Sequence, residues 1–94
     1  DKASERRKLN KFFTIVSNNP QPICDFITQN LKHSATVYQA VGAYSHQNRT
    51  VILAVVDVKQ AILLQRFIHR TEPTAFTAIT KSSEIVGKGF MSYI

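Results

Sequence analysis

The chain has 94 residues, enough for one domain and too few for two. Its apolar content of 44% and charged content of 19% are ordinary for a folded protein and exclude disorder as its overall state. The net charge is +6, the single cysteine (Cys24) excludes an internal disulfide, and the longest apolar run, residues 51–56, is far shorter than the roughly 20 residues of a transmembrane helix.

Residues 1–10 are polar and charged, and we expect a flexible basic lead-in there, followed by a single domain over residues 11–94. Half of the net charge lies in the first eleven residues, which contain Lys2, Arg6, Arg7, Lys8 and Lys11 against Asp1 and Glu5. A nucleic-acid-binding domain more often gathers its Lys and Arg into a stripe on the fold itself. The distribution of charge therefore does not favour nucleic acid as a partner.

The first predicted elements are a strand and a helix. Residues 11–17 are rich in aromatic and β-branched side chains, which favour a strand. Asn19 and Pro20 suit the start of a helix near residue 20. The helix is expected to bury an apolar stripe formed by Ile23, Phe26, Ile27 and Leu31 and to close at His33 and Ser34.

The second half of the pattern repeats the strand and helix signals. Strands are predicted over residues 36–44, 50–56 and 75–80, with a polar hairpin connection at 45–49. Asp57 is a typical N-cap for a helix over residues 58–70, and Pro73 ends that helix. Residues 81–94 are expected to form a tail. The order β-α-β-β-α-β predicts an α+β, ferredoxin-like fold, in which a four-stranded antiparallel sheet carries two helices on one face.

The third strand departs from the alternation expected of a sheet with one solvated face. Every residue from 51 to 56 is apolar, so both faces of this strand favour burial. The second helix likewise carries apolar side chains about 100° away from its main stripe. We therefore predict a homo-oligomer, a dimer or a trimer, with a candidate interface of Leu53, Val55, Leu63 and Phe67. The alternative is a well-packed central strand with small residues outward.

Catalytic and metal-binding patterns are not evident in the sequence. The six acidic residues are scattered, without a close pair for acid–base catalysis. Cys24 and the three histidines show no metal-ligand spacing, and the glycines form no nucleotide-binding motif. We therefore predict a protein that is not an enzyme and that has no cofactor.

Two segments suggest ligand binding of different kinds. Residues 88–93 resemble an RNA-recognition motif, but they follow the fourth strand, and the third strand has no aromatic residue. Glycine turns with basic residues can instead form an anion-binding nest. The candidate anion-binding residues are Gly42, Tyr44, Arg49, Lys81, Gly87, Lys88, Gly89 and Phe90. The alternative, which is the stronger of the two, is that Gly87 and Gly89 serve only to allow positive φ where the chain turns.

Several motifs together resemble the C-terminal domain of YitT-type bacterial membrane proteins, a domain of unknown function. The resemblance covers about residues 12–90, and its most specific pieces are Gly-Ala-Tyr-Ser at 42–45 and Glu-Ile-Val-Gly-Lys-Gly-Phe at 84–90. Further pieces are residues 15–18, residues 35–37 and Glu-Pro-Thr-Ala-Phe at 72–76. The sequence departs from the family pattern at His46, where a glycine is usual, and at Glu72, where an aspartate is usual.

The resemblance implies a domain on the cytoplasmic side of a cell membrane, tethered through segments outside this chain. It also implies a fold similar to PII-like and CutA-like trimers, in which ligands lie between subunits near the loop joining strands two and three. We therefore expect a regulatory or sensory domain that oligomerises and binds a small anionic metabolite or nucleotide between subunits. The alternatives are a structural oligomerisation module without a ligand and, less favoured, a nucleic-acid-binding domain.

Overall fold

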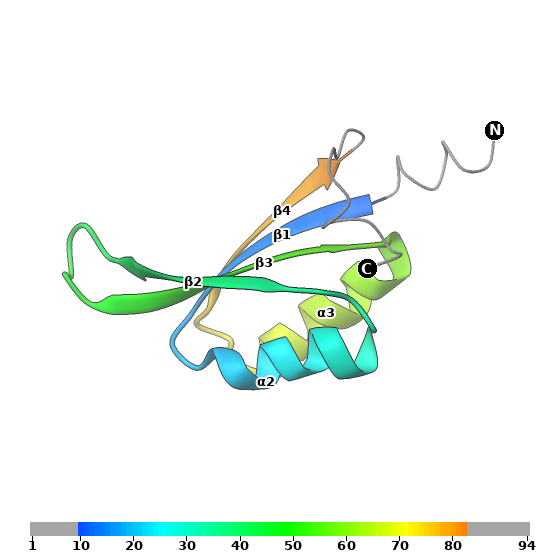
Figure 1. Ribbon diagram of the computed structural model, residues 1–94, viewed down its shortest axis with the longest axis horizontal. Helices are drawn as coiled ribbons and strands as arrows, with labels where there is room; N and C mark the ends of the chain where they lie inside the picture. The colour runs from blue at the N-terminus through cyan, green and yellow to red at the C-terminus, as the bar shows by residue number, and fades with distance from the viewer. Residues whose placement is uncertain (1–9, 83–94) are drawn as a thin grey trace.

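The computed structural model describes residues 10–82, and the six predicted segments appear in it in the expected order (Figure 1). The strands are β1 (Asn10–Ser17), β2 (Thr36–Val41), β3 (Asn48–Val56) and β4 (Phe76–Ser82). The first helix begins as α2 (Pro20–Asp25) and continues as the π-helical segment η1 (Phe26–Asn30). The second helix is α3 (Val58–Thr71).

The four strands form one antiparallel sheet in the order β2-β3-β1-β4, with β2 and β4 at its edges. Both helices lie on the same side of this sheet (Figure 1). This order and layering are those of the ferredoxin-like arrangement, so the predicted fold class is confirmed. No helix of the described residues covers the other side, which we call the open face of the sheet.

The core lies between the sheet and the two helices. Because strand side chains alternate between faces, Phe13 and Ile15 of β1 point to the helices together with Ile52 of β3, which lies opposite Ile15. The helices contribute Ile23, Ile27, Leu31, Ala61, Leu64 and Ile68. Each large aliphatic or aromatic side chain buried in this way stabilises the fold by about 1.5–3 kcal/mol.

The first helix was predicted as one helix, and at its C-terminal end it widens from an α-helix into a π-helical turn. In η1 the amide of Leu31 donates to the carbonyl oxygen of Phe26, five residues earlier, over 3.0 Å. The hydroxyl of Thr28 donates to the carbonyl oxygen of Cys24 over 3.0 Å, and it thus competes for a carbonyl of the helical ladder. The helix is followed by Lys32, whose φ of 60° lies in the left-handed region that glycine usually occupies.

The second helix begins as predicted at Asp57. Its carboxylate accepts a hydrogen bond from the Gln60 amide at 2.8 Å, and the Asp57 amide donates to the Gln60 side chain at 3.2 Å. This is a capping box. The same Gln60 side chain donates to the carbonyl oxygen of Leu31 at 3.1 Å, so it joins the start of α3 to the end of η1.

The strand ends differ from the predictions by a few residues. Strand β2 ends at Val41 rather than at Tyr44, because the chain turns at Gly42. Strand β4 continues through Lys81, which was predicted to belong to the tail, and Asn10 belongs to β1 rather than to the lead-in. Both extensions are stabilised by pairing, since Asn10 lies opposite Ser82 and Lys11 lies opposite Lys81.

Candidate functional site

The β2–β3 hairpin contains the first group of candidate anion-binding residues. Its turn is closed by the Gly42 amide, which donates to the carbonyl oxygen of Gln47 at 3.0 Å, and by the His46 amide, which donates to that of Gly42 at 2.9 Å. A Cβ atom on Gly42 would lie 2.6 Å from the hydroxyl oxygen of Ser45. The Gly-Ala-Tyr-Ser motif thus has a structural role, because its glycine makes room for its serine.

His46 is a position at which the sequence departs from the family pattern, and its backbone conformation shows why glycine is usual there. Its φ is 59°, a left-handed conformation that is costly for residues with a Cβ. The glycine that is usual at this position in the resembling family avoids that cost. Tyr44, between Gly42 and His46, is 98% exposed, so its phenol ring is presented to solvent.

Arg49 lies at the base of the hairpin and has a partner within the fold. Its guanidinium donates to the side-chain oxygen of Asn18 over 2.7 Å. Next to it, the Glu72 carboxylate accepts hydrogen bonds from the Ser17 hydroxyl at 2.5 Å and from the Asn18 amide at 2.8 Å. Two pieces of the sequence resemblance, residues 15–18 and 72–76, therefore meet here and join the end of β1 to the end of α3.

Lys81, the other candidate that the structure describes, is not brought to this end of the sheet. Lys81 of β4 pairs with Lys11 of β1, and Lys11 in turn pairs with Val56 of β3. Arg49 lies seven residues before Val56 on β3. At about 3.3 Å per residue, roughly 23 Å of strand separates the two levels. Gly87, Lys88, Gly89 and Phe90 lie outside the described residues. Within one copy of the chain, the described candidates do not form a single site.

The interface candidates fall on two different sides of the domain. Leu53 and Val55 lie on the open face of the sheet, as the register places them opposite Thr14 and Phe12. Leu63 and Phe67 belong to α3, in the helical layer. The Phe67 ring stacks on Phe26 with ring centroids 4.3 Å apart, so it packs within the domain.

The open face carries an apolar row that crosses all four strands. The register places Tyr38, Val51, Val16 and Phe76 side by side in this row. The valine in the middle of β3 is buried, whereas the two aromatic rings at the edges are 49% and 65% exposed. Sequence reasoning identified the apolar β3 but missed these edge aromatics, because they become neighbours only through pairing of distant strands.

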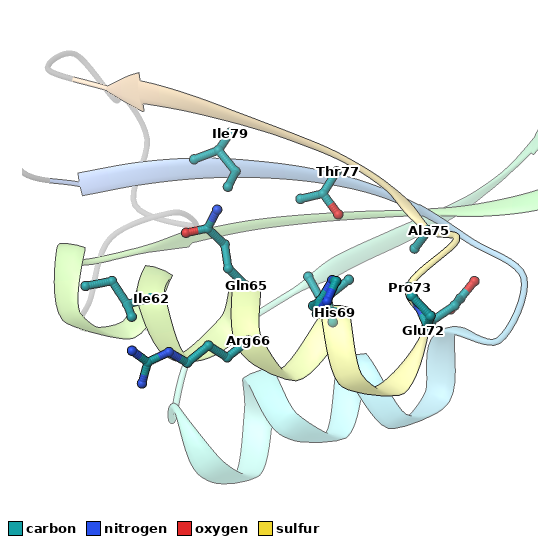
Figure 2. A pocket seen from close by; sticks show the side chains of 10 residues that line it. Ile62, Gln65, Arg66, His69, Glu72, Pro73, Ala75, Thr77 and Ile79 are labelled. Carbon is teal, nitrogen blue, oxygen red and sulfur yellow. The ribbon is translucent and has the colours of Figure 1, made fainter.

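A groove of about 500 Å³ runs between α3 and the edge strand β4 (Figure 2). Gln65 extends from the helix toward Ile79 of the strand, and His69 and Thr77 also line the groove. The Thr77 hydroxyl oxygen is buried and has no hydrogen-bond partner among the described residues. No sequence motif marks this groove, because it is formed where a helix packs beside the last strand of the sheet.

A second hollow, of about 490 Å³, lies between η1 and α3. It is lined by Phe26, Asn30, Leu31, Leu63, Arg66 and Arg70. Two guanidinium groups thus adjoin a mainly apolar lining. Sequence reasoning did not select either arginine, since they are isolated charges on a helix until η1 packs beside them.

The titratable groups of the described chain give little support for covalent or metal chemistry. Burial raises the pKa of the Cys24 thiol above its ordinary value of 9.0, and the adjacent Asp25 carboxylate raises it further. The thiol is therefore protonated near neutral pH and is a weak nucleophile. Between residues 10 and 82, no group of three or more His, Cys, Asp or Glu side chains could hold a metal ion.

Several proteins that are similar to this chain are named membrane proteins. The chain is 25% identical over 80 residues to UPF0750 membrane protein YvjA and 29% identical over 80 residues to UPF0750 membrane protein YdeO, both of Bacillus subtilis (strain 168). The matches cover 85% of this chain but only 28% of each relative, so the chain spans about a quarter of their length. No helix within residues 10–82 has the length and apolarity to cross a bilayer.

Solved structures support the fold, and the family follows from the sequence match. A DUF2179 protein from Eubacterium ventriosum has a TM-score of 0.62 and 28% identity, covering 76% of this chain and 97% of its own. A functionally unknown protein from Pediococcus pentosaceus has a TM-score of 0.64 at 10% identity, covering 85% and 98%, and shows the fold alone. The predicted relation to YitT-type membrane proteins is confirmed by these relatives. Residues 33–87, more than half of this chain, match the family model described as "Uncharacterized protein conserved in bacteria (DUF2179)", and the chain therefore belongs to that family.

Proposed function

We propose that this chain is a non-catalytic regulatory domain of a bacterial membrane protein, and that its copies associate through the open face of the sheet. The membrane context is supported by the relatives that are named membrane proteins, of which the chain spans about a quarter. A position on the cytoplasmic side is favoured by the five cations among the first eleven residues, because Lys and Arg near membrane spans are enriched on that side.

The observation that carries the proposal is the apolar row on the open face. Val51 and Val16 lie in its centre, and the half-exposed Tyr38 and the largely exposed Phe76 lie at its ends. Aromatic side chains in contiguous apolar surface are typical of protein interfaces. Burying both rings against a second copy would stabilise the association by about 25 cal/mol for each Å² of apolar surface removed from water.

The burial of two valines on β3 changes which side chains are expected to drive association. The fully apolar β3 suggested that both of its faces need a partner, yet Val51 and Val55 are buried in a single copy. Their directly opposite neighbours include Tyr38, Val16 and Phe12, which are larger or equal in size and flank them within the sheet. The gain from association is therefore expected at the edge aromatics rather than at the central valines.

Sedimentation velocity over a range of concentrations tests this association. We expect the wild type to be oligomeric at micromolar concentration, and Tyr38→Glu combined with Phe76→Glu to be monomeric. The matched control is Val37→Glu combined with Val41→Glu, since both valines are exposed on β2 but point to the helix side. A monomeric wild type at high concentration, or equal behaviour of the two double variants with unchanged circular dichroism, would contradict the proposal.

The hairpin supports a second candidate function, the binding of a small anion between subunits. It projects from the body of the domain (Figure 1), and Tyr44 at its tip is 98% exposed. A neighbouring copy packed on the open face would lie on the same side as Arg49. A thermal-shift screen with nucleotides and phosphorylated metabolites tests this: a ligand at about 100 times its Kd stabilises a protein by about 2.7 kcal/mol. We expect Tyr44→Ala to abolish the shift, and a panel without any shift would remove this candidate.

A further inference from the structure

Helix α3 has an outward surface with an unusual charge balance. Between Val58 and Thr71 there is no Asp or Glu, so its cations have no acidic partner at helical spacing on the same helix. At about 100° per residue, five residues fall within an arc of roughly 100° directly opposite the buried stripe of Ala61, Leu64 and Ile68. We call them the outer face of α3: Lys59, Ile62, Leu63, Arg66 and Arg70.

The outer face combines its charge with exposed aliphatic side chains. Ile62 and Leu63 are 46% and 48% exposed, although a surface helix would ordinarily carry polar residues there. A basic helix face with large apolar side chains between the cations is typical of helices that lie in the interface of a membrane. The apolar side chains enter the boundary of the acyl region, while the cations contact the anionic headgroups.

The hollow between η1 and α3 gives this surface a place for one headgroup. Arg66 and Arg70 are one helical turn apart and line it together with Leu63. A guanidinium group offers paired donors that match the oxygens of a phosphate. Phe26 and Leu31 add apolar surface on the η1 side, which suits the glycerol and upper acyl atoms beside a lipid phosphate.

We propose that the outer face of α3 docks onto an anionic phospholipid bilayer, with lipid phosphates at Arg66 and Arg70 and with Ile62 and Leu63 in the boundary of the acyl region. This inference rests on the proposed membrane protein context, because a tether of that kind holds the domain at high effective concentration near a bilayer. The outer face belongs to the helical layer, and the proposed association uses the opposite side of the sheet. Docking and association therefore do not compete for the same surface.

Co-sedimentation with vesicles tests the docking. The wild-type chain is mixed with vesicles of phosphatidylcholine alone or of phosphatidylcholine and phosphatidylglycerol in equal amounts. Each Lys or Arg near an anionic surface contributes about 1 kcal/mol, so we expect Arg66→Gln combined with Arg70→Gln to weaken partitioning into the mixed vesicles by about 30-fold. The charge-matched control is Lys32→Gln combined with Lys81→Gln, two exposed lysines outside the outer face.

The control pair is expected to weaken partitioning only a few-fold, through net charge. We also expect Ile62→Ser combined with Leu63→Ser to weaken partitioning at high salt, where Val37→Ser combined with Val41→Ser has little effect. Equal losses in the two charge pairs, or equal binding to phosphatidylcholine alone, would overturn the proposal. Sedimentation velocity without vesicles separates the two proposals, because the arginine variant should still self-associate.

Discussion

The contact between Glu72 and the end of β1 should be one of the main polar determinants of stability. The Glu72 carboxylate accepts hydrogen bonds from the buried Ser17 hydroxyl and from the Asn18 amide. Hydrogen bonds to a charged group contribute about 1.5–3 kcal/mol each, and the exposed Asn18 amide regains part of its contribution from water. We therefore expect Glu72→Ala to lower the free energy of unfolding by about 3 kcal/mol, a large share of the roughly 5–15 kcal/mol of a small domain.

A double-mutant cycle isolates the bond to the buried hydroxyl. Ser17→Ala, Glu72→Ala and the double variant are unfolded in urea and followed by circular dichroism. We expect a coupling energy of about 1.5 kcal/mol between the two sites, because each single change leaves the other group without its partner. Glu72→Gln, which keeps an acceptor oxygen but removes the charge, should fall between the wild type and Glu72→Ala. Additive changes within about 0.5 kcal/mol would refute the reasoning.

Three further predictions concern single positions. Lys32 has a φ of 60°, a conformation that is costly for any residue with a Cβ. Lys32→Gly should therefore stabilise the domain by about 1 kcal/mol and raise Tm by about 4–8 °C, whereas Lys32→Ala should not. Equal melting temperatures of the two variants would contradict this. Gly42→Ala should destabilise the hairpin, because its Cβ would meet the Ser45 hydroxyl at 2.6 Å, and adding Ser45→Ala should restore most of the loss in thermal melts; an unrescued double variant would show another cause. The pKa of Cys24 is raised by burial and by Asp25, so its contribution to stability is complete below the ordinary value of 9.0 and is lost as pH rises toward the folded-state pKa. Urea titrations at rising alkaline pH should therefore show a steeper loss of stability for the wild type than for Cys24→Ser, and parallel curves would exclude this effect.

The elements of this fold were predictable because their signals are local. The spacing of apolar residues in the helices, the β-branched runs of the strands, Asp57 as an N-cap and Pro73 as a stop all act within a few residues of the chain. Their order was sufficient for the ferredoxin-like topology, since handedness and short connections leave few alternatives. The family motifs also identified the relation to membrane proteins.

The surfaces of the domain depended on contacts between distant residues. Pairing of β1 with β3 and β4 places Val16 between Val51 and Phe76, and the same register separates Arg49 from Lys81. The hollow beside Arg66 and Arg70 exists only because η1 packs against α3. Sequence alone thus determined which segments form and which side of each is apolar, through short-range sterics and periodicity. Tertiary structure decided which side chains become neighbours, because register and helix packing are set by the burial of the whole core.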